Sequence, residues 1–166
     1  MRTPKRKPGK YALEKKDFHI TENKYNRLKA ELERLEKIDR PPAIKEVKRL
    51  ALMGDFSENA AYQIAKGKLR SINRRILKVK DFLNHAEIIR PGANKDVVGL
   101  GSKVTLESEG KEKKYQILGS AETNPERGVI SQNSPLGKSL LGKRAGQKVE
   151  IKLPKKTTTY KIIKIE

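Results

Sequence analysis

Gly54-Asp55-Phe56-Ser57-Glu58-Asn59 is a short acidic stretch between two long segments with helical periodicity. Apolar residues recur every three or four positions over residues 25–38 and 44–51 before it, and over residues 61–83 after it. This spacing places apolar side chains in one stripe along a helix. Two such stripes on either side of a glycine-containing turn predict an antiparallel coiled-coil hairpin over residues 21–85, with the acidic stretch as its tip at residues 54–59.

The first helical pattern has a defined start and an internal irregularity. Thr21 stands at its N-cap position, where a threonine hydroxyl accepts a backbone N–H of the first turn. Pro41-Pro42 interrupts the pattern, and we expect these prolines to break or kink the rod because proline lacks the amide donor. A helix of about 30 residues is about 45 Å long, so the acidic tip should stand far from the helix bases.

After Asn84 the helical periodicity gives way to short segments rich in Val, Ile, Tyr and Thr, several of them with alternating polarity. The predicted strands are residues 86–90, 103–109, 113–118, 128–131, 148–153 and 157–165. Ser134 as N-cap, Pro135 as first residue and Gly142 after the end delimit one short helix. The predicted fold class is α+β with two domains, the helical hairpin and a small antiparallel β domain over residues 86–166.

The composition indicates acidic partners. The chain has 166 residues, of which 36% are charged, and a formal net charge of +19. A positive net charge favours a partner that is nucleic acid or an acidic face of a nucleic-acid machine. Selection for basic proteins or for solubility would produce the same excess of positive charge. Residues 1–20 combine proline, glycine and like charges, which predicts a basic disordered tail with either non-specific nucleic-acid contacts or no dedicated partner.

Several classes of site are excluded. The chain has no cysteine, so disulfides, thiolate zinc sites and cysteine nucleophiles are ruled out. His19 and His85 are too far apart in the sequence for a convincing metal or triad site, and we interpret both as ordinary surface or junction residues. The basic N-terminus lacks a signal-peptide apolar segment, and no run reaches the about 18 apolar residues of a membrane span. We therefore expect a soluble, cytoplasmic protein without a membrane partner.

The second helix carries the densest basic run of the chain. Its candidate nucleic-acid-binding residues are Lys66, Arg70, Arg74, Arg75 and Lys78. Arg70, Arg74 and Lys78 follow one another at intervals of four residues and therefore share one helix face beside the apolar stripe. Such a face suits phosphates, and it equally suits a solvated surface of long side chains.

The two acidic residues of the tip have two compatible explanations. In the structural one, Gly54 ends the first helix, Asp55 caps the second and Glu58 occupies the capping-box position. In the functional one, Asp55 and Glu58 supply oxygen ligands to Mg²⁺, a hard cation usually shared with phosphates. Two carboxylates alone bind Mg²⁺ weakly, so such a site needs a partner that provides the remaining ligands. No nucleophile–base pair is recognisable in the sequence.

The motifs together resemble one family. The segment from Gly54 to Tyr62 closely resembles the G-D-x-x-E-N-A-x-Y tip of the bacterial GreA/GreB transcript cleavage factors, with Ala61 at a position that is often acidic there. Arg40-Pro41-Pro42 resembles the R-P-E/P segment of that family. Residues 129–131 and 134–143 are similar to its I-S-x-x-S-P-[LIM]-[AG]-x-[AS]-L-[LI]-G-K segment. The resemblance covers residues 18 to 166 in order.

The resemblance implies a C-terminal domain similar to FKBP prolyl isomerases that docks on bacterial RNA polymerase at the mouth of its secondary channel. We assign the docking contact to Ser134, Pro135 and Leu136. The hairpin would then enter the channel, where Asp55 and Glu58 would help to hold a Mg²⁺ shared with the polymerase active centre, with Ser57 and Asn59 in supporting roles. The factor would bind no cofactor alone.

The reaction implied is cleavage of backtracked RNA by the polymerase itself, so the factor would stimulate that activity without being an enzyme. Its basic face would contact the nascent RNA 3′ end, as in GreB-like members, and the protein would be a monomer. Two alternatives stay open at this point. One is a regulator or inhibitor of the same fold that occupies the channel without promoting cleavage, and the other is a basic nucleic-acid-binding protein that acts independently of polymerase.

Overall fold

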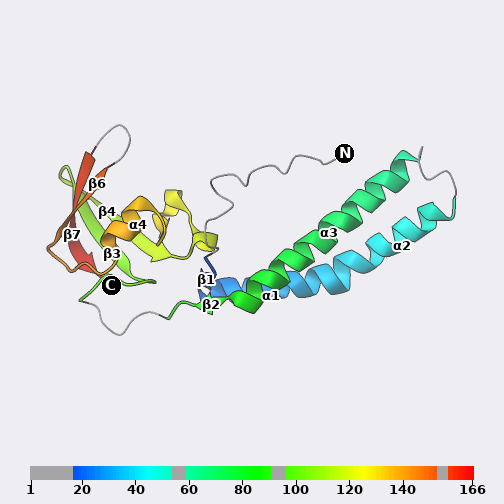
Figure 1. Cartoon of the computed structure of the whole chain (residues 1–166), viewed down its shortest axis with the longest axis horizontal. Coiled ribbons are helices and arrows are strands. Elements are labelled where there is room, and N and C mark those ends of the chain that lie inside the picture. The colour runs from blue at the N-terminus through cyan, green and yellow to red at the C-terminus, as the bar shows by residue number, and fades with distance from the viewer. Residues whose placement is uncertain (1–16, 54–58, 91–95, 153–156) are drawn as a thin grey trace, which may run out of the picture.

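The computed structural model of the chain describes residues 17–53, 59–90, 96–152 and 157–166, and for Lys152 and Thr157 only the backbone. A long helical hairpin projects from one side of a domain built on a curled sheet (Figure 1). This arrangement confirms the predicted α+β fold class, with the hairpin first in the chain and the sheet domain after it. None of the described helices combines the length and apolar character needed to cross a bilayer.

The first arm of the hairpin consists of α1 (Glu22–Arg34), a π-helical turn η2 (Leu35–Asp39) and α2 (Arg40–Ala51). Thr21 is the N-cap of α1, and its Oγ1 accepts a hydrogen bond from Lys24 N at 3.2 Å, as predicted. Of the two outcomes expected for Pro41-Pro42, a break or a kink, the break does not occur, because helical structure continues through this region. The prolines lie in the first turn of α2. This turn follows the wider π-helical turn, in which Arg40 N–H donates to Leu35 O. The missing proline amides therefore remove few helical hydrogen bonds.

The second arm is the single helix α3 (Ala60–His85). Two apolar clusters join it to the first arm. Ile20, Leu28 and Val79 form the cluster nearest the base. Ala43, Ile72 and Ile76 form the cluster midway along the hairpin, where the small alanine side chain leaves room for the two isoleucines.

The sheet domain contains five strands in the order β5-β4-β3-β7-β6. Their bounds are β3 (Lys103–Ser108), β4 (Lys111–Leu118), β5 (Val129–Ser131), β6 (Lys148–Lys152) and β7 (Thr157–Ile165). Neighbouring strands are antiparallel except for β4 and β5, which are parallel. The short helix α4 (Pro135–Leu140) packs on this domain, with Leu140 in a core that includes Val104, Leu106, Ile117 and Ile162. Two short 3-10 helices, η3 (Ser120–Glu122) and η4 (Pro125–Arg127), lie between β4 and β5.

A separate two-stranded ladder lies at the base of the hairpin. The strand β1 (His19–Ile20) pairs in parallel with β2 (Glu87–Ile88). The predicted strand at residues 86–90 is therefore shorter than expected and belongs to this ladder, not to the large sheet. The predicted tail over residues 1–20 is also too long at its C-terminal end, because Ile20 is fully buried and residues 17–20 are part of the base.

Candidate functional site

The acidic tip is bounded by two helix ends that the structure describes. Asp55, Ser57 and Glu58 themselves lie outside the described residues, between the end of α2 at Ala51 and the start of α3 at Ala60. The N-cap of α3 is Asn59, whose Oδ1 accepts a hydrogen bond from Tyr62 N at 3.1 Å. The expectation that Asp55 caps this helix is therefore wrong. Gly54, which was expected to end the first helix, lies outside the described residues, and α2 ends at Ala51. The side chain of Asn59 serves the cap.

The surface beside the tip combines apolar and cationic groups. Leu52, Met53 and Ile64 are large apolar residues with exposed fractions of 89%, 66% and 72%, on both arms near the acidic stretch. On the next turn of α3, Lys66 Nζ lies 5.5 Å from the ring centroid of Tyr62, which holds this cation near the start of the helix. The far end of the hairpin is thus apolar and carries a restrained positive charge.

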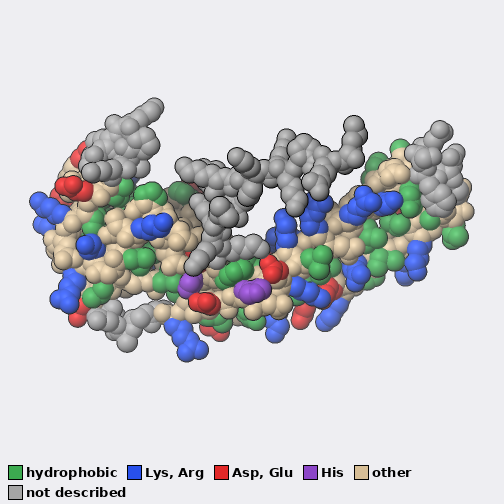
Figure 2. All heavy atoms as spheres, in the orientation of Figure 1, with side chains coloured by type: hydrophobic (Ala, Val, Ile, Leu, Met, Phe, Trp, Pro, Cys, Tyr) green, Lys and Arg blue, Asp and Glu red, His purple; other side chains and the backbone are tan. Residues whose placement is uncertain are grey.

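The predicted basic face of α3 divides into two groups in the structure. Arg70, Arg74 and Lys78 are exposed, and none forms an ion pair with another residue in the described part of the chain. Arg75 instead donates from Nε and Nη2 to the two carboxylate oxygens of Glu31 at 2.6 and 2.8 Å. This hydrogen bonding lowers the pKa of Glu31 and raises the pKa of Arg75. The guanidinium of Arg75 therefore stabilises the hairpin, whereas the other three cations are exposed. Figure 2 shows Lys and Arg side chains spread along the hairpin.

A second ion pair joins the same two arms. Lys80 Nζ lies 2.6 Å from Glu36 Oε1, so that Glu31 and Glu36 both bridge the first arm to α3. The charged groups are 34–49% exposed, and pairs of this kind contribute about 0–1 kcal/mol each. Their main effect is to fix the register between the arms, and with it the position of the tip relative to the base.

The base of the hairpin is joined to the sheet domain through the side chain of Asp17. Its carboxylate accepts hydrogen bonds from Ser120 N and Oγ at 2.9 and 3.0 Å, and from Gln132 Nε2 at 3.0 Å. His19 N and Asn133 Nδ2 donate to the same group at 3.1 and 3.2 Å. Burial to 4% exposure opposes ionisation, but these donors outweigh it and lower the pKa of Asp17 to about 2.

Thr21 and Gly119 complete this junction. The backbone N–H and the hydroxyl of Thr21 donate to the carboxylate of Glu122 at 2.6 and 2.7 Å. A Cβ on Gly119 would lie 1.7 Å from His19 O, so only glycine permits this approach of the two backbones. We refer to the contacts of Asp17 and Thr21 with Ser120, Glu122 and Gln132 as the base junction. The base junction is not predicted from the sequence, because its partners are about a hundred residues apart. The one available signal is the presence of carboxyl and amide side chains that are able to pair.

The residues assigned to docking lie at the start of α4. Ser134 is its N-cap and accepts a hydrogen bond from Gly137 N at 3.0 Å, so its hydroxyl serves the helix. Pro135 is exposed, whereas Leu136 packs partly against the core. Gly137 is buried, and a Cβ there would lie 2.1 Å from Ser131 O. Of the three assigned residues, Pro135 offers the most surface to a partner.

The donor set of the tip fits Mg²⁺ in kind, because aspartate and glutamate supply the hard oxygen ligands that this ion prefers. Elsewhere, the described residues include no group of three or more acidic, histidine or cysteine side chains able to hold a metal ion. His19 contacts Asp17 and Glu87, and His85 stacks on Phe18, so both histidines belong to the base of the hairpin.

Comparison with known proteins agrees with the motifs. The family description "Transcription elongation factor, N-terminal" matches residues 18–88, and "Transcription elongation factor, GreA/GreB, C-term" matches residues 93–166. Transcription elongation factor GreA of Lactococcus lactis subsp. cremoris is 40% identical over 154 residues, covering 91% of this chain and 99% of that protein. The GreA protein of Bacillus licheniformis is 39% identical over 155 residues, covering 92% and 98%.

Among solved structures, GreA factor homolog 1 (Gfh1) of Thermus thermophilus is 32% identical, covering 89% of this chain and 97% of that one, with a TM-score of 0.41. The two family matches together span most of the chain, and the relatives match over nearly their full lengths. The chain belongs to the GreA/GreB family of transcription elongation factors.

Proposed function

We propose that this protein binds bacterial RNA polymerase and stimulates the polymerase to cleave backtracked RNA, which rescues arrested elongation complexes. The observation that carries this proposal is that the acidic motif connects, in the sequence, the end of α2 to the start of α3, and these two helix ends lie at the end of the hairpin farthest from the sheet domain (Figure 1). The 26 residues of α3 correspond to a length of about 39 Å. A rod of this length carries its end into a deep channel while the domain at the base stays outside.

The exposed apolar residues near the tip support the same idea. Leu52, Met53 and Ile64 contact water in the free protein, which is unfavourable for large apolar side chains. Large exposed apolar residues near a functional motif suit a surface that a partner covers. We infer that the walls of the polymerase channel cover them when the hairpin is inserted.

In the proposed mechanism, Asp55 and Glu58 bring two carboxylates to the polymerase active centre. Mg²⁺ held there with the polymerase would activate water and stabilise charge on the scissile phosphate. The chain's own contribution is positional, because the Glu31–Arg75 and Glu36–Lys80 pairs fix the arms against each other. The exposed cations Arg70, Arg74 and Lys78 would bind phosphates of the RNA 3′ segment.

The test uses purified polymerase stalled in backtracked complexes with Mg²⁺, with RNA length followed over time. Wild-type protein should shorten the RNA from its 3′ end, and Asp55→Ala and Glu58→Ala should each abolish this while polymerase binding persists. Glu33→Gln, which removes an exposed carboxylate from α1, is the matched control and should cleave normally. Normal cleavage by both tip variants would refute the role of the tip. Binding without any cleavage by the wild type would instead identify a channel-occupying regulator.

A further inference from the structure

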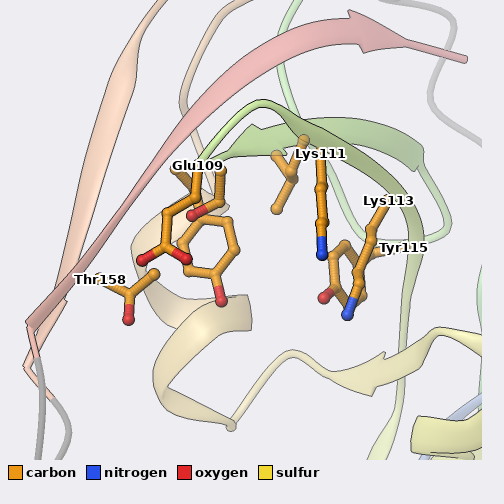
Figure 3. Close-up of a pocket in the computed structure, with 8 residues that line it drawn as sticks. Glu109, Lys111, Lys113, Tyr115 and Thr158 are labelled. Atoms are coloured by element: carbon orange, nitrogen blue, oxygen red, sulfur yellow. The ribbon is translucent and has the colours of Figure 1, made fainter.

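One end of the inner face of the sheet is open. Near β5 this face is covered by α4 and forms the core, but toward the β3–β4 turn it borders a cleft of about 340 Å³. The cleft is lined by Leu106, Ser108, Lys111, Lys113, Tyr115 and Tyr160, among others (Figure 3). We call it the β4 cleft. A volume of this size is at the lower end of the range for ligand sites in proteins.

The strand register explains why these side chains gather there. Across β3 and β4, Leu106 pairs with Lys113 and Ser108 pairs with Lys111, and paired residues point to the same face of a sheet. Side chains alternate along a strand, so the inner face of β4 reads Lys111, Lys113, Tyr115 and Ile117. This face changes from a fully buried isoleucine to two exposed lysines.

The charge of the cleft is uneven. Lys111 and Lys113 project in the same direction from β4, toward the side on which α4 lies (Figure 3). Neither lysine forms an ion pair with any residue that the structure describes. The floor beneath them is apolar, because Leu106 is 1% exposed and the rings of Tyr115 and Tyr160 pack against the core. The cleft thus combines an apolar base with two cations on its rim.

Glu109 lies across the cleft in a conformation that is unusual for its residue type. It forms the β3–β4 turn with Gly110, and their φ angles are 54° and 74°. Among the described residues, Glu109 is the one non-glycine residue with positive φ. Turns with two positive φ values favour asparagine, aspartate or glycine, so a glutamate is unfavourable for the backbone at this position. It gives the cleft an acidic wall opposite the basic one.

We propose that the β4 cleft binds an acidic peptide segment of a protein partner. An apolar or aromatic side chain of the segment would enter above Leu106 and Tyr160, and flanking carboxylates would contact Lys111 and Lys113. The chain's own N-terminal segment is an unsuitable occupant, because residues 1–16 carry seven Lys or Arg residues and one Glu. A second copy is disfavoured by the net charge of +19.

This site is separate from the start of α4 that holds Pro135. Lys111 and Leu118 are at opposite ends of β4, and seven residues of strand span about 24 Å. Leu118 is the end that adjoins Ser131 of β5, which leads into α4. The protein therefore presents two contact areas on its sheet domain, of which the β4 cleft is the one with free cations beside an apolar floor.

The experiment measures binding of the full chain to a fluorescein-labelled peptide, Asp-Glu-Phe-Glu-Asp, by fluorescence anisotropy at low salt. The double variant Lys111→Glu/Lys113→Glu should weaken binding by about tenfold or more. Lys114→Glu is the matched control, because it lies on the same strand with its side chain on the opposite face, and its affinity should stay within about twofold. Glu109→Asn keeps a residue that tolerates positive φ and should strengthen binding by removing repulsion.

The same assay distinguishes the alternatives. A probe with Ala in place of Phe should bind more weakly, because the apolar floor would lose its partner. The proposal is overturned if the wild type shows no saturable binding, or if the double variant binds the peptide as well as the wild type does. It is also overturned if a single-stranded oligonucleotide binds the wild type and loses affinity in the Lys111→Glu/Lys113→Glu variant more than the peptide does. These outcomes are independent of the RNA cleavage assay, because the hairpin is unchanged in all variants.

Discussion

Thr21 and Glu122 are 101 residues apart in the sequence, yet the Glu122 carboxylate accepts hydrogen bonds from both the backbone N–H and the hydroxyl of Thr21 at 2.6 and 2.7 Å. The same hydroxyl of Thr21 accepts from Lys24 N and so caps α1. One residue therefore begins the first helix and attaches it to the sheet domain. This contact, with those of Asp17, attaches the hairpin to the domain and so contributes to the direction in which it leaves.

Glu122→Ala should let the hairpin move more freely relative to the sheet domain, while Thr21 still caps α1. Removing one partner of two short charge-assisted hydrogen bonds is expected to cost about 1–3 kcal/mol of unfolding free energy. Distances between spin labels on α3 and on the sheet domain, measured by double electron–electron resonance, should become more broadly distributed. Glu126→Ala, which removes an exposed carboxylate from η4, is the control. An unchanged distance distribution in Glu122→Ala would show that this contact does not orient the hairpin.

Asp17 should make stability depend on pH in the acid range. Its pKa is about 2 in the folded protein against an ordinary value of 3.8, so the folded state favours the ionised form. The stabilisation is complete above the unfolded pKa and is lost as pH falls through the folded pKa. Asp17→Asn has the same shape without the charge, and at neutral pH it should lower the unfolding free energy by about 2 kcal/mol. Urea unfolding between pH 7 and pH 2 should show this difference shrink toward zero, and a constant difference would contradict the assignment.

Two glycine substitutions should have opposite effects on stability. Gly119→Ala would place a Cβ 1.7 Å from His19 O, and the required backbone shift should cost about 2 kcal/mol or more. Gly67→Ala lies within α3 with no atom within 4 Å of the new Cβ, and it should stabilise the hairpin by about 0.5–1 kcal/mol. Thermal unfolding of both variants beside the wild type is the measurement. Equal effects of the two substitutions would refute the close approach at Gly119.

The basic residues of α3 should separate into two functional groups. Arg70→Glu and Arg74→Glu should reduce crosslinking to RNA in backtracked complexes and flatten its salt dependence, because each removes a cation that faces solvent. Arg75→Gln should chiefly lower stability, by up to about 1 kcal/mol, since this guanidinium is bound to Glu31. Comparable losses of crosslinking in all three variants, at unchanged stability, would show that Arg75 contacts RNA directly.

Local sequence signals were sufficient for much of the fold. The three- and four-residue spacing predicted both arms of the hairpin, Thr21 was identified as an N-cap, and Ser134-Pro135 was placed at the start of α4. Each depends on residues within one or two helical turns. The gap between the predicted strands at residues 103–109 and 113–118 also agrees with the observed β3–β4 turn at Glu109-Gly110.

The errors have two causes, which are the presence of two capping residue types close together and local structure that distant parts of the chain decide. Asn59 caps α3 in preference to Asp55, although both residue types suit that position. Residues 17–20 were assigned to the charged tail, but Ile20 is buried against Leu28 and Val79 and cannot be left in water without loss of free energy. No local pattern encodes the pairing of β1 with β2, because the whole hairpin separates the two strands in the sequence.

The length of the hairpin makes the base junction the most sensitive part of the molecule. A tilt of about 5° at the base displaces the far end of a 39 Å lever by about 3 Å. Catalytic groups that are misplaced by about 1 Å lose much of their effect. In the proposed mechanism, a small tilt at the base would therefore displace the tip carboxylates far enough to reduce RNA cleavage strongly. In the proposed mechanism, substitutions at Asp17, Thr21 and Glu122 would therefore change the activity of this protein without altering either carboxylate of the tip.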